Sequence, residues 1–224
     1  MGTKKVDIYG GKDPREIPAY PLAEAARHLY MSERTLASWT AGRKPLIRIP
    51  QGGSQLSFYN LVEAFVLDVL RRQRRFSLQQ LRRDVSNLQR HFPNLQHPLA
   101  DADLLTYGQQ LYAEDGSDLA NITRAGQLAM PELLRDFLRR VEKDVTGVVR
   151  LYPFTRSQKD PAAPKSVVID PRVSFGRPVI AGTGIPTDVI AERFKAGDSI
   201  AAIAKDYGRA AQEIEEAIRY EAAA

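Results

Sequence analysis

The segment RHLYMSERTLASWTAGRKPL, Arg27 to Leu46, decides the fold of the first part of the chain. The apolar positions before and at its start share one helical face: Leu22, Ala25, Ala26 and Leu29. Ser32 is a typical N-cap for a second short helix, which ends at Gly42. Leu36 and Trp39 of this helix face the first helix. The spacing therefore predicts a helix, a tight turn and a helix.

Polar and basic side chains cover the outer face of the second predicted helix. In a helix-turn-helix, the second helix enters the DNA major groove, where arginine can read a guanine edge and hydroxyls can bind phosphates. Arg34 suits a guanine edge, and Ser32 or Thr35 suits a phosphate. The predicted DNA-binding residues are Ser32, Arg34, Thr35, Ser38, Arg43, Lys44, Arg71 and Arg74. The alternative interpretation is an ordinary polar helix of a helical hairpin.

The residues that follow strengthen the DNA-binding hypothesis. Residues 46–49 and 56–58 are β-prone runs around PQGGS and predict a small hairpin, or wing. An amphipathic helix then begins near Asn60, a possible cap, and Ser77 opens another that ends before Pro93. The segment from position 71 to position 90 contains seven arginines and a single acidic residue. Neutralisation of DNA phosphates would explain this excess of positive charge.

Composition limits the possible classes of protein. The 224 residues carry a net charge of +5. Residues 165–224 hold eight basic against nine acidic residues, so the positive excess lies entirely in residues 1–164 and suits a polyanionic partner. The absence of cysteine excludes disulfides, thiolate metal sites and cysteine nucleophiles. We expect a cytoplasmic protein without a membrane partner, because neither a membrane span nor a signal peptide is present in the sequence.

We predict a mainly α fold with small β elements (α+β) in three folded pieces. The predicted divisions are a flexible lead-in (1–18), a winged helix-turn-helix (19–98), an α+β unit (99–156), a linker (157–165) and a three-helix tail (166–224). In the tail, short strands broken by proline and glycine precede helices over 188–195, 199–207 and 211–220. The middle unit should have a hairpin at Asp115–Gly116, a helix over 130–145 and a strand over 147–154, and its simplest role is to dimerise or space the ends.

No residues suggest catalysis, and we predict neither an enzyme, nor a metal site, nor a cofactor. Acidic residues do gather in the middle unit, at Asp101, Asp103, Glu114, Asp115 and Asp118, but aspartate is common in turns. His28 is expected to be a partly exposed helix residue. His91 and His97 flank Pro93 in a loop with no glutamate or cysteine at ligand spacing.

Residues 20–92 resemble the winged helix-turn-helix of MerR-type regulators, which share the pattern S-x-x-T-L-x-x-W, a wing, a helix and F-S-L-x-x-L-R. Tyr30 occupies the turn where that family favours glycine, so we expect local strain. Ala37 stands where the family usually has a basic residue, which removes one phosphate contact. The long dimerising helix and sensor cysteines of metal-sensing members are also missing.

The stretch IDPRVSFGRPVIAGTGIPT, within a match over residues 167–220, closely resembles a small domain of formerly unknown function with the motif I-D-P…G-x-P-x-I-x-G-T-R-I-P-V and three homeodomain-like helices. Gly184 replaces the arginine of that motif. Joined to a MerR-like head, the domain is similar to VapB-type antitoxins, whose partner is a PIN-domain ribonuclease toxin. The resemblance implies a homodimeric antitoxin that binds this toxin and represses its own operon on double-stranded operator DNA.

Within the tail, an arginine beside an aromatic residue suits a protein interface. We therefore expect toxin contacts from Arg172, Phe175, Arg177 and Pro178. The glycines around Thr183 lack the lysine of a P-loop and favour turns over phosphate binding. The alternative function is a stand-alone MerR-like regulator without a toxin, in which the tail dimerises or contacts DNA again. The glutamates of the last helix argue against that second DNA contact.

Overall fold

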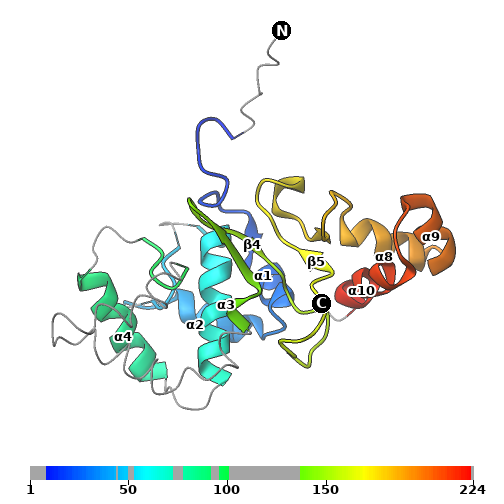
Figure 1. The fold of residues 1–224 in the computed structure, drawn as a ribbon. Helices are drawn as coiled ribbons and strands as arrows, with labels where there is room; N and C mark the ends of the chain where they lie inside the picture. The colour runs from blue at the N-terminus through cyan, green and yellow to red at the C-terminus, as the bar shows by residue number, and fades with distance from the viewer. Residues whose placement is uncertain are drawn as a thin grey trace, which may run out of the picture.

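The computed structural model describes residues 9–43, 45–49, 53–72, 78–91, 96–100 and 137–222. Helices dominate this part of the chain, and the strands within it form three two-stranded antiparallel sheets. The predicted mixture of helices with small β elements is thus confirmed. Figure 1 shows α3 and β4 near the centre, α4 on one side and the tail helices α8, α9 and α10 on the other.

The head begins with the expected pair of short helices. Its elements are β1 (Tyr20–Pro21), α1 (Leu22–His28), α2 (Glu33–Thr40), β2 (Gln55–Leu56), α3 (Phe58–Arg72) and α4 (Leu78–His91). Ser32 caps α2 by accepting a hydrogen bond from the Thr35 amide, as predicted. Tyr30 has a φ of 49°, so the predicted strain in the turn is confirmed: a non-glycine residue occupies the left-handed region there.

The wing prediction was wrong in its pairing. In the described part of this region, residues 46–49 form no strand, and β2 pairs with β1 instead of turning back on them. Leu46 and Ile47 are fully buried, and their amides both donate to the carbonyl of Trp39, at 2.8 and 3.0 Å. The apolar run therefore continues the core under α2, because burying these side chains is more favourable than exposing them on a wing.

The third helix starts two residues earlier than expected. Ser57 precedes its first residue, and the Ser57 hydroxyl accepts a hydrogen bond from the Asn60 amide. The Asn60 side-chain oxygen in turn accepts from the Ser57 amide at 3.2 Å. This reciprocal arrangement is a capping box, so Asn60 completes the cap rather than starting the helix.

The middle piece is described only from residue 137 onward. Here β3 (Val141–Asp144) and β4 (Gly147–Leu151) form a hairpin. The strand predicted from residue 147 is confirmed, but the helix predicted over 130–145 is wrong at its end, where β3 lies. Gly147, directly after the turn, has a φ of 108°, and the Asp144 carboxylate accepts a hydrogen bond from the Thr146 amide. The hairpin at Asp115–Gly116 lies outside the described residues.

The tail follows its prediction closely. It contains β5 (Val167–Val168), the 3-10 turn η1 (Ser174–Gly176), β6 (Val179–Ile180), α8 (Thr187–Lys195), α9 (Ile200–Tyr207) and α10 (Ala211–Ala222). Ser199 caps α9, and Gly208 ends it in the left-handed conformation, as expected. Ile180, Ile190, Ile203 and Ile214 are fully buried in the small tail core.

The head and the residue that follows the first tail strand share one hydrophobic core. It runs from Tyr20 through the head helices to Leu151 and Ile169. The backbones of Leu151 and Ile169 exchange hydrogen bonds at 2.8 and 3.0 Å, so β4 joins the start of the tail. The residues between β4 and β5 contain neither helix nor strand, yet Lys159 within them is buried against the head. The segment predicted as a linker therefore also packs.

Candidate nucleic-acid and protein interfaces

The outer face of α2 presents the predicted polar side chains to solvent. Ser32, Arg34, Ser38 and Arg43 are exposed, and Thr35 is half-buried. The hydroxyls are engaged within the helix: that of Ser38 donates to the Thr35 carbonyl at 2.7 Å. The guanidinium groups of Arg34 and Arg43 have no ion pair or hydrogen bond within the described part of the chain. They are therefore available to an external anion.

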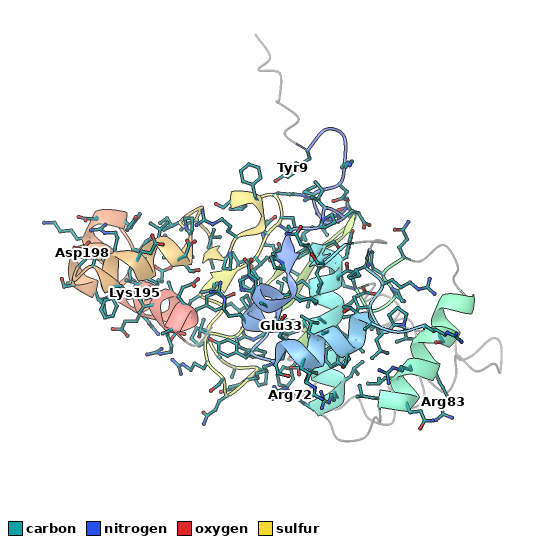
Figure 2. All side chains as sticks on the ribbon, turned by 180° about the vertical axis from the view of Figure 1, so that it is seen from behind. Tyr9, Glu33, Arg72, Arg83, Lys195 and Asp198 are labelled. Atoms are coloured by element: carbon teal, nitrogen blue, oxygen red, sulfur yellow. The ribbon has the colours of Figure 1, made fainter. Side chains whose placement is uncertain are left out.

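Two further helices bring arginines beside α2. The Arg82 side chain of α4 lies 3.4 Å from the carbonyl oxygen of Ser38, so α4 runs next to the end of α2. Arg83 on α4 is exposed, and so is Arg71 at the end of α3. In Figure 2, the labelled Arg72 and Arg83 side chains lie along the same edge of the molecule. We call Arg34, Arg43, Arg71, Arg72, Arg82 and Arg83 the basic edge.

One member of the basic edge is already neutralised, and two predicted members cannot be placed. Arg72 pairs with Asp68 at 2.9 Å, one helical turn earlier. Lys44 and Arg74 lie outside the described residues. Within the part of the chain that the structure describes, the exposed members without an ion pair or hydrogen bond are thus Arg34, Arg43, Arg71 and Arg83.

A strained loop in the tail holds one aromatic ring in solvent. Phe175 is 69% exposed, although large apolar side chains are normally buried. Ser174 and Phe175 have φ values of 48° and 55°, and both lie in the left-handed region that disfavours non-glycine residues. The Tyr9 ring meets Phe175 edge to face at 6.2 Å. Strain of this kind concentrates at functional sites, so the loop is a candidate binding feature.

The other predicted tail contacts differ in their availability. Arg177 is exposed and pairs with Asp188 of α8. Arg172 is exposed, with its guanidinium 3.7 Å from the Asp144 carboxylate at the hairpin tip. Pro178 is buried, and its carbonyl accepts the Thr187 amide at 3.0 Å. Pro178 therefore fastens the loop to α8 beneath the surface.

The departure at Gly184 leaves open space. A Cβ atom placed there would meet no atom within 4 Å. The Gly184 carbonyl accepts a hydrogen bond from the Ser174 hydroxyl at 3.1 Å. Glycine at this position is thus not required by crowding, and its backbone supports the strained loop.

Two histidines have environments that the sequence did not reveal. His28 was expected to be partly exposed, but it is 1% exposed and hydrogen-bonded to Tyr220, 192 positions away. His97 has no glutamate or cysteine at ligand spacing in the sequence, yet it lies between Glu63 and Glu16. Both partnerships join segments that are remote in the chain, so no local spacing could have identified them.

The acidic residues of the middle unit, Asp101, Asp103, Glu114, Asp115 and Asp118, lie outside the described residues, as does the side chain of His91. Among the residues that are described, no group of three or more histidine or acidic side chains could hold a metal ion. In the same part of the chain, every helix is too short or too polar to cross a membrane.

Comparison with known proteins finds relatives of the tail and of the whole chain. Residues 167–220 match a family described as a protein of unknown function, DUF433. The whole chain is similar to a Mycobacterium tuberculosis protein named "Putative antitoxin VapB45", with 28% identity over 91% of this chain and 93% of the relative. It is also similar to the crystal structure of Rv2018 from the same organism, with a TM-score of 0.68, 28% identity, and coverage of 91% of this chain and 98% of that one.

These similarities extend over head, hairpin and tail together. The family match coincides with the tail from β5 to Tyr220. The full-length relative and the solved structure include the head as well. The combination of this head with this tail is therefore shared with another protein over nearly its whole length.

Proposed function

We propose that this protein is the antitoxin of a type II toxin–antitoxin pair, which binds and inhibits a PIN-domain ribonuclease and represses its own operon by binding DNA. The head reads double-stranded operator DNA as part of a cytoplasmic homodimer. Residues 99–156 space or dimerise the protomers, and the tail binds the toxin. The name of the similar M. tuberculosis protein supports the antitoxin part of this proposal.

The basic edge carries the DNA-binding part. Arg34 stands on the exposed face of α2 without a partner in the described residues, which is the position of a base-reading side chain in a helix-turn-helix. Arg71 on α3 and Arg83 on α4 are also exposed, and exposed arginines can neutralise phosphates. Glu33 is the acidic residue at the start of α2, and it favours the helix through the dipole rather than contacting DNA.

The strained loop supports the toxin-binding part. Phe175 projects with Arg172 and Arg177 exposed on either side of it in sequence. An exposed aromatic ring with flanking arginines has the composition of an interface hot spot. The active site of a metal-dependent ribonuclease is rich in carboxylates, to which these arginines would be attracted once their exposed local pairs exchange.

Binding to the DNA upstream of the gene tests the head. Arg34→Ala should weaken operator binding by about 1–3 kcal/mol and relax sequence preference, because it removes a base contact. Arg83→Ala should weaken binding to all sequences and lower the salt slope by about one. Arg209→Ala, which removes a half-buried arginine paired to Glu213 in the tail, is the control. Unchanged affinity in Arg34→Ala would remove α2 from the DNA-reading role.

Growth arrest tests the tail. The open reading frame next to this gene is expressed alone, with the full protein, and with a Phe175→Ser variant. Arrest that the unaltered protein rescues and Phe175→Ser does not would establish an antitoxin that acts through the loop. Phe194→Ser removes another exposed aromatic residue, 42% exposed on α8, and should still rescue. Absence of arrest would favour the alternative, a MerR-like regulator that acts without a toxin.

A further inference from the structure

The turn between α1 and α2 is held by residues from the other end of the chain. The Tyr220 hydroxyl of α10 lies 2.6 Å from Nδ1 of His28, the last residue of α1. Both side chains are buried, and their rings stack at 6.0 Å. On the other side of the imidazole, Nε2 lies 3.3 Å from the Glu24 carboxylate. If the tyrosine hydroxyl donates to Nδ1, the ring proton lies on Nε2, which is close to the Glu24 carboxylate but makes no hydrogen bond.

The next residue of the turn is held by the segment before the tail. The Lys159 ammonium donates to the carbonyl oxygen of Leu29, the C-cap of α1. It also pairs with Asp68 of α3 at 2.5 Å, and only 4% of its side chain is exposed. Lys159 therefore links the end of α1 to the side of α3 from a position 130 residues away in sequence.

The third residue of the turn is the strained one. Tyr30 has a φ of 49°, which costs free energy unless neighbouring contacts maintain it. Burial and the negative charges of Glu216 and Glu221 on α10 raise the pKa of the Tyr30 hydroxyl to about 12. The proximity of these charges places Tyr30 beside the same helix that supplies Tyr220.

We propose that Tyr220 and Lys159 are positioning residues for DNA reading: from the C-terminal part of the chain, they fix the turn that sets the direction of α2. The inference rests on the proposed operator binding by the head. It assigns to α10 a role in the DNA-reading unit, in addition to any contact that the tail makes with another protein.

The proposal makes specificity, rather than total affinity, the sensitive quantity. Base reading requires α2 to enter the groove at one angle, whereas phosphate contacts from Arg71 and Arg83 tolerate small shifts. Loosening the turn should therefore weaken operator binding and leave binding to unrelated DNA nearly unchanged. A merely structural role would lower both affinities together through loss of folded protein.

Two variants and one control test the proposal in the full chain. Tyr220→Phe removes only the hydroxyl, and Lys159→Met keeps the aliphatic length while removing the ammonium. Each should lower the ratio of operator to unrelated-DNA affinity by about tenfold, the equivalent of one lost buried hydrogen bond. Tyr152→Phe removes another tyrosine hydroxyl, bonded to Glu142 in the hairpin, and should leave the ratio unchanged.

Hydrogen exchange separates this inference from the proposed function. The amides of Leu29, Tyr30 and Met31, which bond to carbonyls of α1, should exchange faster in Tyr220→Phe than in the unaltered protein. An unchanged affinity ratio together with unchanged exchange would overturn the inference while leaving operator binding intact. If the unaltered protein does not bind operator at all, the proposed DNA function is overturned. Faster exchange in Tyr220→Phe would then mean that the Tyr220–His28 contact shapes the turn but has no role in DNA reading.

Discussion

Nδ1 of His97 lies 3.1 Å from the carboxylate of Glu63, a side chain only 2% exposed. On the opposite edge of the ring, Nε2 lies 3.1 Å from the carboxylate of Glu16. The imidazole also stacks on Tyr59 at 5.0 Å. His97 thus joins the lead-in to α3, and its charge decides whether the buried Glu63 has a cationic partner.

This relationship predicts a loss of stability as the pH rises above 6.5. Burial alone would lower the pKa of His97, but the hydrogen bond and charge of Glu63, joined by the charge of Glu16, raise it above 6.5. The stabilisation by the charged form is therefore complete below pH 6.5 and is lost as pH rises through the higher pKa of the folded state. The free energy of unfolding should fall over that range in the unaltered protein and much less in His97→Gln, as urea titrations would measure. Parallel curves for the two proteins would contradict the prediction.

The wing shows how far the sequence could predict the head. The amphipathic spacing of α1, α2 and α3 and the N-cap at Ser32 are local signals, and the structure has all of them. The pairing of β2 is not local: its partner, β1, lies more than thirty positions away, before α1. Residues 46–49 carry a β-prone pattern that burial under Trp39 overrides.

Ile47 distinguishes a buried segment from a wing. Its side chain is fully buried in the head core, so Ile47→Ala should cost about 2–5 kcal/mol of unfolding free energy. An exposed wing residue would cost about 0.5 kcal/mol or less. Chemical denaturation of the variant measures this directly, and Arg48→Ala, at the exposed neighbouring position, is the control. A small effect at Ile47 would restore the wing.

In the tail, too, local features could be predicted from the sequence, whereas long-range contacts could not. Its helices and their glycine and serine boundaries follow from short-range rules and could be predicted within a few residues. The residue types at positions 141–144 are compatible with a helix, but pairing with β4 makes this segment a strand. The partners of His28, His97 and Lys159 lie 34 to 192 positions away in sequence. Rules based on local spacing do not address such long-range contacts.

Gly176 is predicted to be sensitive because of the strained loop's contact with the head. Its φ is 80°, and an added Cβ would collide with the Tyr20 hydroxyl, which itself donates to the Gly176 carbonyl at 3.1 Å. Gly182 has a similar φ of 75° with no atom within 4 Å of a Cβ. Gly182→Ala should therefore cost about 1 kcal/mol from backbone strain, and Gly176→Ala about 2–3 kcal/mol more from the collision. Equal losses of thermal stability would show that the tail loop and head do not meet as described.

Lys159 should be more costly to truncate than an exposed lysine. Its removal leaves Asp68, which is 12% exposed, with Arg72 as the remaining cationic partner among the described residues, and leaves the Leu29 carbonyl without this donor. Because removing one partner of a buried ion pair is unfavourable, Lys159→Met should cost about 3 kcal/mol, and Lys205→Met, on the exposed side of α9, close to zero. The double variant Lys159→Met/Asp68→Leu should recover part of the loss, because it removes the carboxylate as well as the ammonium. Additive losses in a double-mutant cycle, measured by urea denaturation, would mean that the two groups do not interact. The segment before β5 would then be a linker that contributes little to the free energy of unfolding through this contact.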